Sequence, residues 1–357
     1  MASWRPSKRR RLPDDERCSS CAKKKHLYLA LDDWKGGYSI HKIDVENMED
    51  DYLPEPAALR FTAPEIRPMA FAAVGANILI ATNPGCSRDL APPCLVYDTG
   101  TGGLAVGPRL PDGYLHDFLP AMAVGERLYA ITIVYNEQLE ASSSLQVLSW
   151  APTTNRQEPW DPKMAWSWSA APTSPPFTKH ETITSYALHP DGHTIFVSTD
   201  WVTLSFDTSN GVWRELGDWV LPFRGQAYFD DDLDAWVGLH HQKEGYIGCC
   251  SVAPRSAAAA NTWRPECKML KEKLFHMEED PKRHLKATLS YMGDSRFCLV
   301  ENVLRRRECL ESVLHVTVFG LKYGQKGELQ TKVRRTTRSY ALSKNSSLLF
   351  SHEAFWM

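Results

Sequence analysis

The chain has 357 residues, of which 43% are hydrophobic and 24% are charged, which excludes a wholly disordered protein and supplies enough apolar surface for a large core. The net charge of −2 is unevenly spread: residues 1–25 carry nine basic and three acidic residues, and the remainder carries 32 basic and 40 acidic residues. A basic tail on a mildly acidic body makes nucleic acid an unfavoured partner for the body.

The cysteines and the longest apolar run indicate the cellular compartment of the protein. There are nine cysteines, an odd number, and the N-terminus is charged where a secretory signal would be apolar, so we expect reduced thiols inside a cell. The longest apolar run, residues 69–81, is shorter than the roughly 20 residues that span a bilayer, so no membrane partner is expected.

Residues 1–25 show no periodic apolar pattern, and we expect a disordered tail. Two basic clusters in it have the spacing of a bipartite nuclear import signal that an adaptor protein reads. A solvated tail that aids solubility is the alternative, and contact with a nucleic-acid backbone is a third one; we favour import, and hence the nucleus over the cytoplasm. The candidate import residues are Lys8, Arg9, Arg10, Arg11, Lys23, Lys24 and Lys25.

From residue 26 onward, short alternating apolar runs separated by turn residues predict strands throughout. Residues 186–222 are the clearest unit, with strands expected at 183–188, 194–199, 202–206 and 212–216. Four short antiparallel strands in about 40 residues match one blade of a β-propeller. Further units start near Pro68, Phe118, Gly225 and Leu285, and a first hairpin turns at Gly36-Gly37.

Two of these units share a step at the end of the third strand. Tyr97-Asp98-Thr99 and Phe206-Asp207-Thr208 each precede a turn that contains glycine, where an Asp side chain can satisfy turn amides. Trp213 then begins the outermost strand, where its ring can fill the gap between neighbouring blades. The residues that we expect to form blades are Tyr97, Asp98, Phe206, Asp207, Trp213 and Leu216.

This pattern resembles kelch repeats, whose blades carry an aromatic-Asp step, a Trp about six residues later and a Leu-x-x-x-x-Pro ending. The unit that contains Phe206 fits this pattern as far as Leu216 and Pro222. The earlier unit fits it in part, through Tyr97, Asp98, Leu104 and Pro111. The kelch double glycine is absent. Over residues 7–345, stretches such as SKRRRL, YFDDDLDAWVGLH and YMGDSRFCLVE resemble a plant family, expanded in grasses, of uncharacterised proteins with a kelch-like domain. The resemblance implies a propeller and a plant source, and it implies no activity.

Candidate chemical sites each have a simpler explanation. Cys18 and Cys21 have the spacing of half a zinc site, but the second half is missing, so free thiols are expected. The His189/His193 and His240-His241 pairs are expected at turns and rims, and Asp230–Asp234 in a solvated turn, because it lacks the calcium-loop pattern. Arg305–Arg307 and the run Lys332–Arg338 fit either a basic stripe or a protected sheet edge. No nucleophile elbow or phosphate-binding loop is present in the sequence, so no catalytic, cofactor or metal residue is predicted.

The sequence therefore predicts a disordered tail at 1–25 and an all-β domain at 26–357, a closed kelch-like propeller of six four-stranded blades whose C-terminal strand joins the first blade. We expect a non-enzymatic scaffold that binds a protein partner through loops on the propeller face. A propeller enzyme, an oxidase or a glycan-processing protein with a site in the central channel, is the alternative. Convergent His, Tyr and carboxylate side chains at the channel mouth would refute the scaffold, whereas a shallow apolar or mixed surface there would support it.

Overall fold

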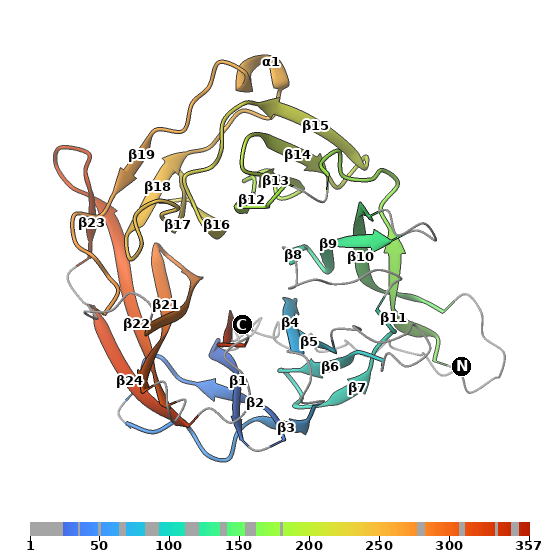
Figure 1. Ribbon diagram of the computed structural model, residues 1–357, viewed down its shortest axis with the longest axis vertical. Coiled ribbons are helices and arrows are strands. Elements are labelled where there is room, and N and C mark those ends of the chain that lie inside the picture. Colours follow the sequence, from blue (N-terminus) through green and yellow to red (C-terminus); the bar gives the residue numbers. More distant parts are fainter. Residues whose placement is uncertain are drawn as a thin grey trace, which may run out of the picture.

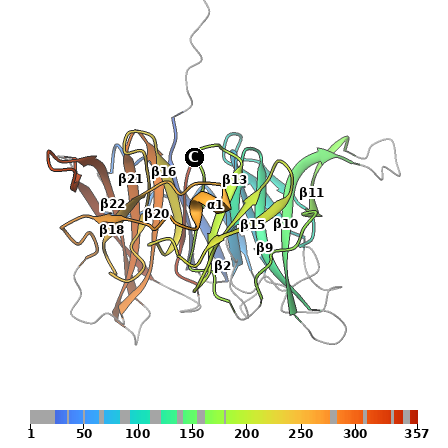
Figure 2. The same ribbon diagram turned by 90° about the horizontal axis from the view of Figure 1, so that it is seen from above.

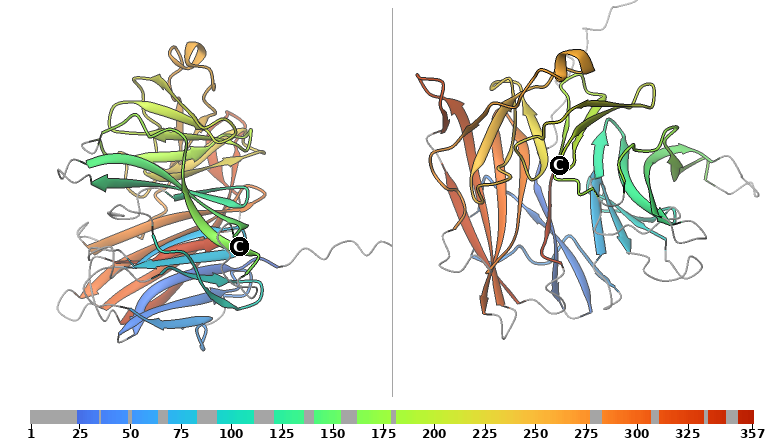
Figure 3. Two further views of the ribbon diagram at one scale, coloured as in Figure 1. Left: turned by 90° about the vertical axis from the view of Figure 1, so that its right-hand side faces the viewer. Right: turned by 45° about the horizontal axis from the view of Figure 1, so that its top comes forward.

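The computed structural model describes residues 24–34, 36–48, 51–63, 69–82, 93–110, 121–135, 141–153, 162–178, 181–276, 283–306, 311–332, 335–343 and 350–357. Within them the chain is almost entirely β-structure, with one four-residue helix, α1 (Ala257–Ala260). The strands form sheets arranged around a common centre, as in a propeller (Figure 1). Seen from the side in Figure 2 and in the two views of Figure 3, the strands run between two faces of this ring.

Three sheets have four strands each. The first has the order β25-β1-β2-β3, formed by β25 (Glu353–Trp356), β1 (Leu27–Trp34), β2 (Gly37–Ile43) and β3 (Leu59–Thr62). The next contains β4 (Met69–Val74), β5 (Asn77–Thr82), β6 (Leu95–Asp98) and β7 (Leu104–Val106). The third contains β8 (Ala121–Val124), β9 (Arg127–Tyr135), β10 (Ala141–Pro152) and β11 (Met164–Ala170).

An eight-stranded sheet joins two further groups of four. The first group comprises β12 (Ser185–Leu188), β13 (Thr194–Ser198), β14 (Thr203–Asp207) and β15 (Val212–Gly217). The second comprises β16 (Gly225–Asp230), β17 (Ala235–Leu239), β18 (Ile247–Ser251) and β19 (Cys267–Met269). The two innermost strands, β12 and β16, pair in parallel with Ser185 opposite Gly225. The four strands expected in residues 183–216 are confirmed.

The remaining sheet has five strands: β20 (His284–Gly293), β21 (Arg296–Arg306), β22 (Glu311–Tyr323), β23 (Leu329–Thr331) and β24 (Thr336–Ser343). Both β23 and β24 pair with β22, so they share the outer edge of this group. At the end of the chain, β25 pairs antiparallel with β1, with Leu27 opposite Trp356, which confirms the expected joining of the last strand to the first group.

Burial explains why some strands are continuous apolar runs and others alternate. All five residues of β13 are buried, because this strand is covered by the groups on both sides. The outer strand β3 instead alternates between half-buried and exposed positions, β15 is mostly exposed with only Leu216 buried, and β7 is exposed throughout. In the two-residue turns that precede β5 and β9, Gly75 and Gly125 adopt φ values of +57° and +58°, which favour glycine.

The core consists of separate apolar clusters between consecutive groups, so packing continues where backbone pairing stops. One cluster joins residues of β8–β10 to those of β12–β14, and another joins β16–β18 to β20–β22. The group of β20–β24 also shares a cluster with β1 and β2, through side chains such as Val300, Leu314 and Leu29. Among the described residues, β12 and β16 alone join neighbouring groups by strand pairing, so the sheets do not close into one continuous sheet.

The connections define two faces. We call "turn face" the side that carries the turns from the first to the second strand of each group, such as residues 189–193 and 231–234. We call "loop face" the opposite side, which carries the turns from the second to the third strand, such as residues 199–202 and 240–246. The chain enters β1 from the turn face, where the backbone of His26 pairs with that of Met357.

Candidate functional site

Most of the candidate import residues lie outside the described residues: Lys8, Arg9, Arg10, Arg11 and Lys23. Lys24 and Lys25 are described and exposed. The Lys24 ammonium lies 2.5 Å from a carboxylate oxygen of Asp44, at the start of the connection between β2 and β3. Lys24 therefore contacts the folded domain at the turn face.

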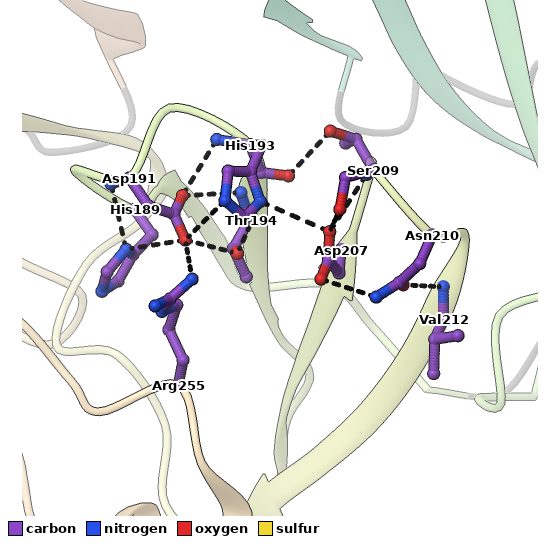
Figure 4. Close-up of polar contacts among 10 residues, drawn as sticks. His189, Asp191, His193, Thr194, Asp207, Ser209, Asn210, Val212 and Arg255 are labelled. Atoms are coloured by element: carbon purple, nitrogen blue, oxygen red, sulfur yellow. Dashed lines mark hydrogen bonds and ion pairs between the residues drawn. The ribbon is translucent and has the colours of Figure 1, made fainter.

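The two aromatic-Asp steps lie at equivalent places. Asp98 follows the buried ring of Tyr97 and accepts hydrogen bonds from the Gly100 N–H and the Thr101 hydroxyl, both at 2.8 Å. Asp207 accepts bonds from the Ser209 N–H, the Ser209 hydroxyl and the Asn210 amide (Figure 4). The hydrogen bonds from Ser209, with a contribution from His193, lower the pKa of Asp207. In this geometry the two carboxylates hold turns.

The remaining blade residues pack between groups. Phe206 is 1% exposed, and its ring lies 5.0 Å from that of Trp213, which also contacts Phe177 edge-on. Both rings belong to the cluster shared with β8–β10, so Trp213 fills space between neighbouring groups. Leu216 is also 1% exposed and belongs to the cluster on the other side, with Trp236.

A dense polar cluster surrounds Asp191 on the turn face (Figure 4). One oxygen of its carboxylate accepts the N–H groups of His193 and Thr194, and the other accepts the Thr194 hydroxyl and an Arg255 N–H. Burial opposes ionisation, but these hydrogen bonds outweigh it and lower the pKa of Asp191 to about 2. A carboxylate held this firmly in its ionised form is a poor proton acceptor near neutral pH, and its geometry fits a structural role.

The expectation of a solvated turn at Asp230–Asp234 is wrong for Asp230. Its side chain is fully buried, and one oxygen accepts the Leu233 N–H at 2.9 Å and the Ser295 hydroxyl at 2.8 Å. Ser295 also reaches Asp232, at 3.1 Å. Ser295 belongs to the following group, so Asp230 joins two groups by a hydrogen bond that no local sequence pattern reveals.

The described basic residues of the run Lys332–Arg338 bind backbone carbonyls. Arg338 donates to the carbonyl of Met48, Arg335 to that of Leu274, and Lys332 to that of Asp294. These bonds tie the outer edge of the group to its surroundings. The described cysteines are free and four of the five are buried: Cys94, Cys249, Cys250, Cys267 and Cys298.

A cavity of about 980 Å³ lies at the centre of the ring, lined by residues of all the innermost strands, β4, β8, β12, β16, β20 and β25. Its size reaches the upper end of the range for small-molecule sites. Because these strands start at the loop face, Arg224 before β16 and His284 at the start of β20 lie at the opening there. They are joined by His240, His241 and Glu244 of the turn between β17 and β18.

The imidazole of His240 is fixed at this opening. Its Nδ1 accepts the N–H groups of Gln242 and Lys243, both at 3.1 Å, so the ring proton lies on Nε2. Burial, together with the nearby Lys243 and His241, lowers the pKa of His240. A neutral His240 therefore offers a hydrogen-bond donor at neutral pH.

His284 lies between two carboxylates. Its Nδ1 is 3.5 Å from Glu244, which is exposed, and its Nε2 is 3.2 Å from Glu301, whose side chain is 1% exposed. The ring stacks on Phe275 with centroids 4.6 Å apart. Glu301 also accepts the backbone N–H of His276 at 3.0 Å. His284 therefore lies between the cavity opening and a buried acid.

Deeper in the cavity, three tyrosines come from successive innermost strands: Tyr186, Tyr228 and Tyr291. Burial raises the pKa of all three tyrosines. Glu353 raises it further for Tyr186, Tyr186 and Glu353 do so for Tyr228, and Asp230 does so for Tyr291. The three hydroxyls therefore stay protonated. Facing them, the Lys286 ammonium pairs with Glu353 at 2.5 Å.

The cavity thus contains His, Tyr and carboxylate side chains, but the histidines lie at the opening and the tyrosines lie deeper, so the combination expected of a channel-mouth site is met only in part. Sequence reasoning weighed His240-His241 only as rim residues and did not single out the three tyrosines, Lys286 or Glu353. These residues share a position on the first strand of a group. That shared position could have identified them, but it can be recognised only when the strand order is known. No described group of His, Cys, Asp and Glu residues is arranged to hold a metal ion. In the described part of the chain, no helix has the length and apolar character that crossing a membrane requires.

Comparison with solved structures finds distant similarity over most of the chain. Hsv2 of Kluyveromyces lactis is 12% identical and covers 87% of this chain and 82% of its own, with a TM-score of 0.43. A chain of the nidogen/laminin complex is 12% identical, and the match covers 89% of this chain and 97% of that one, with a TM-score of 0.42. The WD40 domain of SCAP from fission yeast is 11% identical, and the match covers 90% of this chain and 83% of that one, with a TM-score of 0.34. Because these scores are below 0.5, the description of the fold rests on the strand order and packing of this chain.

No curated protein matches the chain. A family match covers most of it: residues 24–340 match the family described as "Protein of unknown function (DUF1668)". The chain therefore belongs to the DUF1668 family.

Proposed function

We propose that the chain is a six-bladed, kelch-like propeller that acts as a non-enzymatic scaffold for a protein partner. The blade number is supported by the apolar clusters between consecutive four-stranded groups, including the cluster between the last group and the first. The kelch-like character is supported by the two aromatic-Asp steps at Asp98 and Asp207 and their turns.

One observation carries the scaffold proposal: Trp201 is 74% exposed on the loop face. A Trp at the surface of a rigid turn is typical of the anchors that dominate binding energy in protein interfaces. The turn is held by Thr199, whose hydroxyl accepts the N–H of Val202 at 3.4 Å, and by Asp200, which accepts the N–H of Thr182 at 3.2 Å. The indole is therefore presented by a fixed backbone.

Charged groups surround this anchor, as at the rim of an interface. The Thr184 hydroxyl donates to the Thr199 carbonyl, and the Thr184 carbonyl accepts the N–H of Gly225. These two bonds place the exposed Arg224 beside the Trp201 turn. The next turn of the loop face exposes His241, Gln242, Lys243 and Glu244. We call the set Asp200, Trp201, Arg224 and Lys243 the "Trp201 surface", and we propose that the partner binds there.

The test is capture of partners by the full-length chain from its source tissue, with two matched variants. Trp201→Ala removes the proposed anchor, and Tyr52→Ala removes a comparable exposed ring, 82% exposed, in the connection between β2 and β3 on the turn face. We expect a protein that wild type and Tyr52→Ala both enrich and that Trp201→Ala loses. Measured with that purified partner, Trp201→Ala should weaken binding by at least about 30-fold, or about 2 kcal/mol. Equal binding by both variants would refute the Trp201 surface.

A propeller enzyme with a site in the central cavity is the second candidate, and the arrangement of His284 favours it. Its imidazole lies between an exposed and a buried carboxylate at the opening of a cavity, an arrangement in which general acid–base residues are found. The test follows the composition of a metabolite extract during incubation with wild type and with His284→Ala. A compound consumed by wild type alone would support the enzyme, and an unchanged extract would leave the scaffold as the better proposal.

A further inference from the structure

The charges that line the central cavity balance each other. Among the described residues, four side chains of the lining are of charged types: Arg224 and Lys286 are cationic, and Glu244 and Glu353 are anionic. Lys286 and Glu353 bind each other at 2.5 Å, and Glu244 lies 3.5 Å from His284. A ligand with a net charge would have to separate such a pair and would find no uncompensated partner deep in the cavity.

Hydroxyl groups and aromatic rings form a further part of the lining, and alanine and other aliphatic side chains of the innermost strands complete it. Tyr186, Tyr228 and Tyr291 place phenol groups on three successive strands, and the rings of Tyr228 and Tyr291 are 6.4 Å apart at 31°. Thr288 and Ser290 add smaller hydroxyls on β20. Because the tyrosine hydroxyls stay protonated, they can donate hydrogen bonds as well as accept them.

A wall of this composition disfavours an apolar ligand, which would leave the ion pair and the hydroxyls without water and without hydrogen-bond partners. It suits a molecule that donates and accepts many hydrogen bonds through hydroxyl groups and packs its C–H surface on rings. The volume of about 980 Å³ leaves room for more than one ring of that kind.

We propose that the central cavity binds a neutral polyhydroxylated ligand, a monosaccharide or short oligosaccharide, between the tyrosines and the Lys286–Glu353 pair. The proposal deepens the second candidate function, because it names a ligand class for the cavity, and it does not depend on the Trp201 surface. Glu353 would accept ligand hydroxyls with the oxygen left over from its ion pair, and Tyr228 would bind from the adjacent strand.

The experiment uses the full-length chain and a panel of sugars at millimolar concentration, followed by saturation-transfer NMR and calorimetry. Glucose, galactose, maltose and cellobiose are the neutral probes, and galacturonate and glucose 6-phosphate are the charged ones. We expect at least one neutral probe to bind and the charged probe of matching stereochemistry to bind more weakly. Glu353→Gln and Tyr228→Phe should each weaken binding by about tenfold or more, the loss expected when one hydrogen bond to a charged or buried group is removed.

Two controls keep the outcome clear. Tyr52→Ala and Trp201→Ala should bind the sugar as wild type does, and the thermal unfolding of Tyr228→Phe, which removes only a hydroxyl, shows whether a loss reflects unfolding. Absence of binding by every neutral probe, preference for the charged probes, or binding that survives both cavity substitutions would each overturn the proposal. Partner capture that depends on Trp201 would stand in all of these cases, so the two proposals can fail separately.

Discussion

Replacing Asp191 by Asn removes one negative charge from the turn between β12 and β13 and keeps the shape of the side chain. The carboxylate is 12% exposed and accepts bonds from two backbone N–H groups, the Thr194 hydroxyl and Arg255. Asn can still accept the two N–H groups with its carbonyl oxygen. Its amide nitrogen, however, replaces the oxygen that faces Arg255.

The pKa of Asp191 gives the size of the effect. Its value falls from 3.8 in a model peptide to about 2 in the folded chain. Each unit corresponds to about 1.4 kcal/mol, so ionised Asp191 stabilises the fold by about 2 kcal/mol at neutral pH. Because the folded-state pKa is the lower one, this contribution is complete above about pH 4 and is lost as the pH falls towards 2.

The assay is urea unfolding of wild type and Asp191→Asn, followed by tryptophan fluorescence at pH 7 and pH 3. We expect the variant to lose about 2 kcal/mol of unfolding free energy at pH 7 and about half of that at pH 3. Arg255→Ala is the companion variant: its partner guanidinium is 52% exposed, so we expect a loss below about 1 kcal/mol. The same loss for Asp191→Asn at both pH values, or a larger loss for Arg255→Ala, would refute the reasoning.

Three further predictions concern other parts of the chain. Burial, together with the stacked ring of His276 at 3.7 Å between centroids and with Arg305, outweighs the attraction of Glu301 and lowers the pKa of His315 to about 4. Stability should therefore fall by up to about 3 kcal/mol as the pH drops from 6.5 to 4. The melting temperature of His315→Asn should depend less on pH than that of wild type, and an equal pH dependence of the two would contradict this. Phe206→Ala should cost about 3 to 5 kcal/mol in urea unfolding, whereas Val212→Ala, 40% exposed in the adjacent strand, should change stability by less than about 0.5 kcal/mol; equal losses would contradict the packing role of Phe206. Residues 1–25 fused to a fluorescent reporter should carry it into the nucleus, and Ala at Lys8, Arg9, Arg10 and Arg11 should abolish this; a reporter that stays in the cytosol would reject the import signal.

Local patterns sufficed for much of the fold. Alternating apolar runs and Gly- or Asp-containing turns placed β12 to β15 within two residues. The apolar C-terminus correctly predicted β25 beside β1. These predictions succeed because strand alternation and turn chemistry depend on residues near each other in the chain.

The candidate site depended on contacts that are distant in sequence. Lys286 and Glu353 are 67 residues apart, and Ser295 reaches Asp230 across 65 residues. Nothing in the residues around Asp230 distinguishes a buried acid from a solvated one, and the prediction of a solvated turn was wrong there for that reason. The tyrosines of the cavity likewise come from separate groups that meet only at the centre of the ring.

The sequence by itself determined the strands, their turns and the membership of most groups, because these follow from short-range periodicity and backbone preferences. Tertiary structure decided which innermost strands of the groups face one another. That arrangement creates the cavity and its balanced charges, and it leaves Trp201 exposed. The physical reason is that the lining of a central channel belongs to no single unit: each group contributes one strand, and the site exists only when the groups pack around a common axis.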